Sequence, residues 1–206
     1  NKHRIGVKWG TPAIALGLRA VEQLQHRRDE SFTDAVGLLW AVKGRVIVSG
    51  MGKSGHIGNK IAATLASTGT PAQFVHPAEA CHGDMGMITR SDAALLMSNS
   101  GTTAEITALL PLLKRLGLPI VAMTGNPDST LARAADAHLN ISVDEEACPL
   151  DLAPTASTTA NLVMGDALAI AMLEQSGFTA EDFAFTHPGG ALGRRLLTRV
   201  SDVLVT

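Results

Sequence analysis

Residues 49–56, SGMGKSGH, join an apolar run to a stretch with helical spacing and could bind an anion. Gly50, Gly52 and Gly55 lack side chains, so the backbone there can approach a ligand closely. The first turn of a helix presents unpaired N–H groups that attract anions. Lys53 adds a positive charge in that turn, where a purely solvated lysine is less favoured than in the last turn. We expect Lys53 to face an anionic ligand, with an exposed helix residue as the alternative.

The same glycines spell G-x-G-x-x-G, the pattern of a dinucleotide-binding loop. That loop needs an acidic residue about 20 positions later, at the end of the second strand, to bind the ribose. Here Val75 is followed by His76 and Pro77, and Glu79 comes only after this break. An ATPase-type phosphate loop would need a further glycine where Ile47 stands. Both comparisons argue against a nucleotide.

Two further stretches rich in Ser and Thr follow the same plan. Residues 98–105, SNSGTTAE, end an apolar run and open a helical one, so their hydroxyls and N–H groups could bind phosphate without a metal. Thr102 and Glu105 also match a capping box, in which Glu105 would only hold the helix start. Residues 155–159, TASTT, precede a long helical stretch as a ligand contact or as a cap. Three such corners at one sheet edge favour a phosphosugar site.

The elements that must position these corners alternate between short apolar runs and helical patterns. The runs carry continuous apolar character, which is typical of strands buried on both faces of a parallel sheet. This pattern predicts an α/β fold, a doubly wound five-stranded parallel sheet flanked by helices. The expected strands are 45–49, 72–75, 93–98, 119–124 and 138–143. The expected helices between them are 57–67, 104–116 and 129–135.

Three more helical stretches flank this core, at 13–26, 31–42 and 158–175, and would cover the sheet or pack between subunits. Residues 1–10 show no clear pattern, so we expect a frayed or processed end. We therefore divide the chain into an N-terminal helical segment at 1–40, packing on the core, and one domain at 41–206.

Composition limits the possible partners. The 206 residues carry a formal net charge of −2 and only 3% aromatics, and no basic run exceeds two residues, so we expect no nucleic-acid partner. Clean apolar stretches are shorter than the ~18 residues of a membrane span, and no leader-like segment opens the sequence. Cys81 and Cys148 are too few for a disulfide framework or a thiolate zinc site. We expect a cytoplasmic protein with a small-molecule partner and no membrane contact.

Four stretches closely resemble the sugar isomerase (SIS) domain of bacterial D-arabinose-5-phosphate isomerases. They are GMGKSGHIGNKIAATLASTGTPAQFVHPAEACHGDMGMI, SNSGTTAEITALLPLLKRLG, DEEACPLDLAPTASTTANLVMGDALA and GFTAEDFAFTHPGGALGRRLL. The resemblance covers residues 41–203, about four-fifths of the chain. Departures are small: Cys81 stands where Ser or Ala is common, and Met85 where Leu is usual. Most relatives carry a CBS pair that would begin near residues 200–203, and we expect the SIS domain here without it.

The resemblance implies interconversion of D-ribulose 5-phosphate and D-arabinose 5-phosphate, a precursor of the lipopolysaccharide sugar Kdo. It implies catalytic residues at Lys53, His82, Glu105, Glu146 and His187. It implies substrate contacts at Ser54, Gly69, Thr70, His76, Ser98, Ser100, Thr102, Thr103, Ser157 and Thr158. No cofactor is required. His76 also matches a histidine implicated in zinc binding, where the ion would be non-essential or inhibitory because a designed site has three or four ligands.

Isomerisation through an enediol needs a base that moves a proton between C1 and C2 and a partner that moves one between O1 and O2. Glu146 or Glu105 is the candidate carbon base, and His82 and His187 would serve ring opening or the oxygen proton. Lys53 would stabilise the enediolate or hold the phosphate. Because related SIS domains form dimers or tetramers, we expect a homodimer or homotetramer in which His187 completes a neighbour's site.

Two alternatives stay open. A phosphosugar-sensing SIS module without catalysis would need the Ser- and Thr-rich corners but not Lys53, His82 and His187 together. A SIS-fold lyase or etherase acting on amino-sugar phosphates would have to accommodate an N-acetyl group, and no feature of the sequence indicates a site for one. We favour the isomerase, whose product could enter lipopolysaccharide, capsule or sugar-alcohol metabolism.

Overall fold

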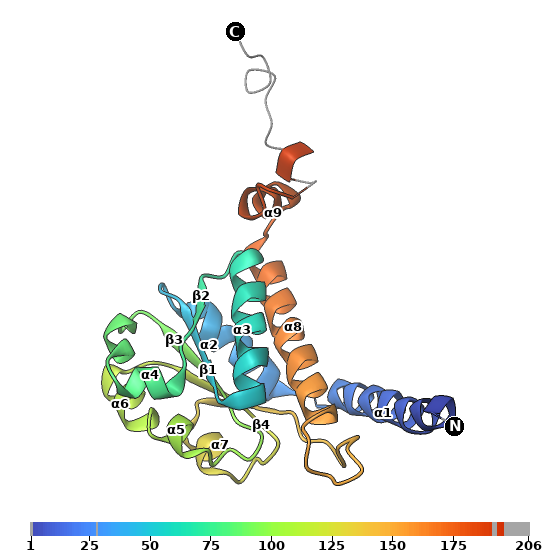
Figure 1. Cartoon of the computed structure of the whole chain (residues 1–206). Coiled ribbons are helices and arrows are strands. Elements are labelled where there is room, and N and C mark those ends of the chain that lie inside the picture. Colours follow the sequence, from blue (N-terminus) through green and yellow to red (C-terminus); the bar gives the residue numbers. More distant parts are fainter. Residues whose placement is uncertain (1, 28, 191–192, 196–206) are drawn as a thin grey trace.

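A computed structural model of the chain describes residues 2–27, 29–190 and 193–195, and its centre is a five-stranded parallel sheet (Figure 1). The strand order is β2-β1-β3-β4-β5, and every neighbouring pair is parallel. The strands are β1 (Val46–Gly50), β2 (Ala72–Phe74), β3 (Ala93–Met97), β4 (Ile120–Thr124) and β5 (Ala137–Asn140). Every residue of β1, β3 and β4 is buried, as the continuous apolar runs predict. The predicted doubly wound fold is confirmed.

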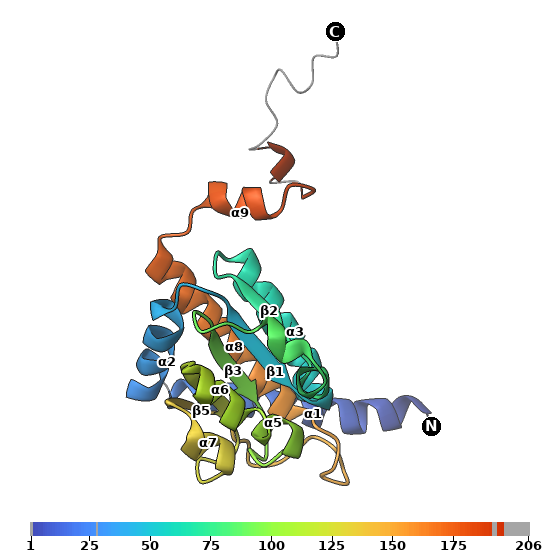
Figure 2. The same ribbon diagram turned by 90° about the vertical axis from the view of Figure 1, so that its left-hand side faces the viewer.

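Helices cover both faces of this sheet, which makes three layers (Figures 1 and 2). One face carries α1 (Lys2–Gln25), α2 (Glu30–Ala41), α3 (Gly52–Ser67) and α8 (Ala156–Ser176). The other carries α4 (Pro77–Cys81), η1 (Asp84–Met87), α5 (Ala104–Thr107), α6 (Leu110–Leu116) and α7 (Thr130–Ala134). Alternate residues of β1 serve the two cores: Val46 and Val48 pack in the first, Ile47 in the second.

The helix α8 belongs to the first face, and its start lies at the carboxyl edge of the sheet. By length and composition alone it could cross a membrane, but half of its most apolar window is buried inside the molecule. It packs there against α1 and α3, in the manner of a core helix. Beyond its last turn follows α9 (Ala180–Thr186), at the end of α8 farthest from that edge (Figure 1).

Several predicted boundaries are wrong. The helix expected at 104–116 is two helices, α5 and α6, because Pro111 near the start of α6 has no N–H and blocks a continuous hydrogen-bond ladder. The helix α3 begins at Gly52, directly after β1, and not at residue 57. The strand β5 ends at Asn140, not at 143. Residues 2–10 are helical and not frayed.

The segment around His187 also differs from expectation. A proline and two glycines at 188–190 favour extended backbone for residues 185–190, but α9 runs through Thr186 and His187 is its C-cap. A capping box explains the helix: the Thr179 side chain accepts from the Asp182 N–H, and the Asp182 carboxylate accepts from the Thr179 N–H. The junction expected at residues 200–203 lies outside the described residues.

Candidate functional site

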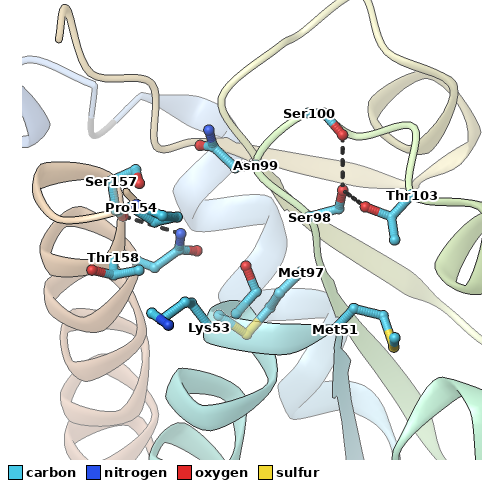
Figure 3. Close-up of a pocket in the computed structure, with 12 residues that line it drawn as sticks. Met51, Lys53, Met97, Ser98, Asn99, Ser100, Thr103, Pro154, Ser157 and Thr158 are labelled. Carbon is cyan, nitrogen blue, oxygen red and sulfur yellow. Dashed lines mark hydrogen bonds between the residues drawn. The ribbon is translucent and has the colours of Figure 1, made fainter. Parts of the chain in front are cut away.

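A cavity of about 330 Å³ opens at the carboxyl edge of the sheet, beside the ends of β1 and β3 and the start of α8 (Figure 3). The chain leaves β1 toward β2 on one side, and β3 lies on the other, so this is the topological switch point where open α/β sheets bind ligands. The lining residues are Met51, Lys53, Ser54, Met97, Ser98, Asn99, Ser100, Thr103, Pro154, Ser157, Thr158 and Asn161.

The three corners predicted from the sequence meet in this cavity. Lys53 and Ser54 come from the first turn of α3, and Ser157 and Thr158 from the first turn of α8. Ser98, Ser100 and Thr103 come from the segment between β3 and α5. Seven of the predicted site residues therefore share one cavity, namely Lys53, Ser54, Ser98, Ser100, Thr103, Ser157 and Thr158.

A chain of hydroxyls forms one wall (Figure 3). Ser98 Oγ lies 2.7 Å from Thr103 Oγ1 and 3.5 Å from Ser100 Oγ. The Gly101 N–H donates to Ser98 Oγ at 3.0 Å. Gly101 has a φ of +67°, and a side chain there would meet Ser129 Oγ at 2.0 Å, so this tight turn requires glycine. The wall can donate several hydrogen bonds to an anion such as phosphate.

Lys53 supplies the charge. It is the only charged side chain among the described lining residues. No hydrogen bond or ion pair within the described part of the chain engages its ammonium group, which is exposed. Figure 3 shows Lys53 and Thr158 on one side of the cavity and the Ser98–Ser100–Thr103 hydroxyls on the other. An anionic ligand between them would contact the lysine and the hydroxyls together.

Glu146 lies behind the cavity wall and caps α8. Its Oε2 accepts from the Thr155 N–H at 2.7 Å, from Thr155 Oγ1 at 2.9 Å and from the Ser157 N–H at 3.3 Å. Burial alone would raise the pKa of Glu146, but the hydrogen bonds from Ser157 and Thr155 outweigh it and hold the pKa below the ordinary value. The Thr155 side chain makes no cap hydrogen bond: its Oγ1 accepts from the Ala147 N–H at 2.8 Å, and the Ser157 N–H donates to Glu146 instead.

Glu105, unlike Glu146, is exposed and makes no described hydrogen bond to a helix start. It is exposed in the first turn of α5, two residues after the cavity-lining Thr103. The alternative that Glu105 serves a capping box is wrong, because Thr103 and not Thr102 is the N-cap residue, and it makes no side-chain cap bond. The Thr102 hydroxyl donates to Ser100 Oγ at 3.1 Å instead. Glu105 therefore keeps its carboxylate free of such a cap.

The two predicted histidines of the β2 side flank a short helix outside the cavity. His76 is the N-cap of α4, with Nδ1 accepting from the Ala78 N–H at 3.3 Å. His82 is the exposed C-cap of the same helix. Across the described residues, no group of three or more His, Cys, Asp or Glu side chains is placed to hold a metal ion.

Gly69, Thr70 and His187 lie at the opposite end of the molecule's first helical face. Gly69 and Thr70 follow the last turn of α3, whose 16 residues place them roughly 24 Å from Lys53. The Thr186 hydroxyl donates to the Ser67 carbonyl at 3.1 Å, so α9 packs at this same end. The rise of α3 therefore separates Gly69 and Thr70 from the cavity of their own chain.

His187 is held there by its own helix. Its ring stacks on Phe183 with 4.0 Å between centroids, and Nδ1 lies 2.9 Å from the Phe183 carbonyl oxygen. The 21 residues of α8 separate this end from the cavity by roughly 30 Å. His187 therefore cannot reach the cavity of its own chain in this arrangement.

Sequence reasoning missed five lining residues: Met51, Met97, Asn99, Pro154 and Asn161. Two of them carried a usable signal. Asn99 lies between the predicted Ser98 and Ser100. Asn161 lies four residues after Ser157, on the same face of α8. The two methionines could not be found, because an apolar side chain at a strand end gives no sign of whether it faces a core or a cavity.

Comparison with known proteins agrees with this geometry. Residues 38–171 match the family model described as SIS domain. The chain is 67% identical over 191 residues to arabinose 5-phosphate isomerase KdsD of Pseudomonas aeruginosa, covering 93% of this chain and 59% of that protein. It is 58% identical over 197 residues to KdsD of Escherichia coli K12, covering 96% of this chain and 60% of the relative. The chain thus spans about 60% of the length of these curated relatives.

A solved structure extends the comparison to three dimensions. E. coli CFT073 c3406, determined in complex with arabinose 5-phosphate, is 43% identical and superimposes with a TM-score of 0.85, covering 91% of this chain and 99% of that one. The family model spans the ends of β1 and β3 and the start of α8, where the cavity lies. The chain belongs to the SIS domain family.

Proposed function

We propose that this chain is an aldose-ketose isomerase that interconverts D-ribulose 5-phosphate and D-arabinose 5-phosphate. The observation that carries the proposal is the cavity with Lys53 on one side and the Ser98–Ser100–Thr103 hydroxyls on the other. Its volume of about 330 Å³ is at the small end of the usual range for ligand sites, as a pentose phosphate requires. The KdsD name of the 67% identical relative and the arabinose 5-phosphate complex of the 43% identical structure support this substrate.

The hydroxyl wall and Lys53 would divide the work of binding. A phosphate dianion accepts hydrogen bonds, and Ser98, Ser100 and Thr103 supply hydroxyl donors on one wall. Lys53 would then either pair with that phosphate or stabilise the negative charge that develops on the enediolate oxygen. A point charge on a flexible stem suits both roles.

Glu105 is the better placed of the two candidate carbon bases. A base that takes a proton from carbon needs a pKa near the working pH. Glu146 accepts three hydrogen bonds on one oxygen, and its pKa is lowered by them despite the opposing effect of burial. We therefore assign the base to Glu105 and a positioning role at the start of α8 to Glu146, with His82 assisting ring opening.

His187 would act in the site of another subunit. Its separation from its own cavity, along the length of α8, supports a homodimer or homotetramer in which α9 of one chain reaches the cavity of the next. Gly69 and Thr70 lie at the same end and would contact a neighbour's substrate in the same way. Proton transfer of this kind needs no cofactor. A zinc ion at His76 would be non-essential or inhibitory. We expect the protein to act in the cytoplasm.

The direct test is turnover. Purified protein is incubated with D-ribulose 5-phosphate in deuterated buffer, and D-arabinose 5-phosphate is followed by NMR. The proposal predicts formation of the aldose with solvent deuterium at C2, because the proton that the base removes from C1 exchanges with the solvent before a proton is returned to C2. Binding of the sugar phosphate without turnover would support the sensing module instead. Turnover of only amino-sugar phosphates would support the lyase or etherase. A role in the Kdo pathway would be tested by deleting the gene for this protein and measuring whether the cells lose lipopolysaccharide.

A further inference from the structure

Asn161 carries an unpaired hydrogen-bond acceptor beside the cavity. It lies in α8, lines the cavity and is only 2% exposed. Its Nδ2 donates to the Ser157 carbonyl at 3.1 Å. Its Oδ1 is buried and has no hydrogen-bond partner among the described residues. Buried polar groups are nearly always paired, so this acceptor calls for an explanation.

The orientation of the amide follows from its one partner. The Ser157 carbonyl can only accept a hydrogen bond, so the atom of Asn161 that faces it must be the NH₂ group. The oxygen is therefore the group left over, and exchanging the two atoms would place two acceptors against each other. The missing partner of Asn161 must be a donor.

The chemistry of the cavity limits which donor could pair with Asn161 Oδ1. A phosphate dianion offers acceptors only, so it cannot serve Oδ1. Lys53 and Ser54 are neighbours in the lining, but neither donates to Oδ1 in the described structure. The hydroxyl groups of a sugar chain are donors of the right kind and would enter the same cavity with the phosphate.

We propose that Asn161 Oδ1 accepts a hydrogen bond from a hydroxyl of the bound sugar phosphate and thereby sets its direction in the cavity. The phosphate lies toward the Ser98–Ser100–Thr103 wall, and the polyol chain lies toward α8. Asn161 is then the residue that distinguishes a phosphorylated sugar from phosphate alone. This inference rests on the proposed function, because it takes the ligand to be a sugar phosphate.

Binding measurements with the full chain test this assignment apart from catalysis. D-Arabinitol 5-phosphate, which has no carbonyl and is not turned over, and inorganic phosphate are titrated calorimetrically into wild type and Asn161→Leu. Leucine is close in size but has no acceptor. We expect affinity for arabinitol phosphate to fall about 3- to 10-fold, the effect of one neutral hydrogen bond. Affinity for inorganic phosphate should change less than about twofold, because no phosphate oxygen contacts Oδ1 in the proposed pose.

Thermal stability separates this role from a structural one. Asn161→Leu removes both the unpaired buried acceptor and the Nδ2 hydrogen bond to the Ser157 carbonyl, two effects of opposite sign, so the unfolding temperature should change little. Met164→Ala is the matched control, since Met164 is 2% exposed on the same helix but outside the cavity lining. It should lower the unfolding temperature and leave both affinities as they are. Asn161→Ala provides the same binding comparison if the leucine variant does not fold.

The outcomes are distinct. Equal loss of both ligands in Asn161→Leu, or loss of neither, would overturn the assignment. So would a wild type that binds arabinitol phosphate no more tightly than inorganic phosphate. A wild type that binds the polyol phosphate selectively but does not isomerise ribulose 5-phosphate would remove the proposed function, and the comparison of the two affinities would still decide the role of Asn161.

Discussion

At the scale of single residues, Lys53 combines exposure, a positive charge and the absence of any described partner with a place in the cavity lining. Lys53→Ala should lower kcat/KM by about 10²- to 10³-fold, as the loss of one electrostatic donor does in a partly desolvated site. The unfolding temperature should change little, because the side chain makes no described hydrogen bond or ion pair that would be lost. Steady-state kinetics and thermal unfolding of the same preparation measure both. A variant with more than half of the wild-type turnover would return Lys53 to an ordinary surface role.

The two carboxylates are separated by their glutamine variants. Glu105→Gln removes the proposed base and should lower kcat by about 10²- to 10⁴-fold. Glu146→Gln keeps an oxygen that can accept the bonds from Thr155 and Ser157, so turnover should fall by less than about tenfold. Turnover and solvent-hydrogen exchange of the substrate are the measurements. The reverse order of effects would make Glu146 the base, and two fully active variants would transfer the role to a histidine.

Acid stability provides the second readout for Glu146. Although burial raises the pKa of this carboxyl, hydrogen bonds from Ser157 and Thr155 hold it below the ordinary value of 4.5 in the folded protein. The resulting contribution to the free energy of unfolding is present above about pH 4.5 and is lost as the pH falls through the lower folded pKa. Lowering the pH from 7 to 3 should therefore reduce the free energy of unfolding of the wild type more than that of Glu146→Gln, and urea denaturation at each pH measures both. Parallel curves for the two proteins would contradict this.

A zinc ion at the single residue His76 should not be required for turnover. Hydroxyls, backbone N–H groups and Lys53 can bind a phosphosugar without an ion, so EDTA should leave turnover intact, or raise it by removing inhibitory zinc. Added zinc should inhibit wild type, and His76→Gln should reduce that inhibition. Activity that disappears with EDTA and returns with zinc would show the ion to be essential.

At the scale of elements, the contact between α3 and α8 fixes the two helix starts that carry Lys53 and Ser157. Gly165 of α8 packs against Ile61 of α3, and a Cβ at Gly165 would lie 2.3 Å from Ile61 Cδ1. Gly165→Ala should therefore destabilise the fold by about 1–3 kcal/mol through overpacking. Gly37→Ala in α2 is the matched control: no atom lies within 4 Å of its Cβ, and alanine should stabilise that helix by about 0.5–1 kcal/mol. Urea denaturation measures both, and shifts in the same direction would refute the packing argument.

At the scale of the whole molecule, the distance between His187 and the cavity predicts complementation between chains. Lys53→Ala and His187→Ala proteins should each be inactive alone and should regain part of the wild-type activity when refolded together. Some mixed oligomers would then hold a cavity with an intact Lys53 and a neighbour with an intact His187. Each variant refolded alone is the control. Mixed oligomers that contain both chains and stay inactive would place His187 outside the shared site.

The extent to which this site could be predicted depends on the sequence range over which each feature is encoded. The corners after β1 and β3 are local: a buried strand, a Ser- or Gly-rich turn and a helix start follow one another within about ten residues, so their side chains and their common edge follow from periodicity and turn chemistry. The break at Pro111 was local too and could have been predicted. Lys53, the Ser98 segment and the parallel sheet were accordingly found from sequence.

Only the tertiary structure decided what lies next to what across the chain. Glu146 meets the start of α8 across a loop of irregular backbone, and no spacing rule predicts that its carboxylate caps this helix and has a lowered pKa. Asn161 enters the cavity because α8 presents that face to the sheet. Three predicted site residues lie far from the cavity of their own chain, because rigid helices of 16 and 21 residues separate them from Lys53: Gly69, Thr70 and His187. Periodicity encodes which face of an element is buried, whereas distances between elements depend on how the helices pack on the sheet.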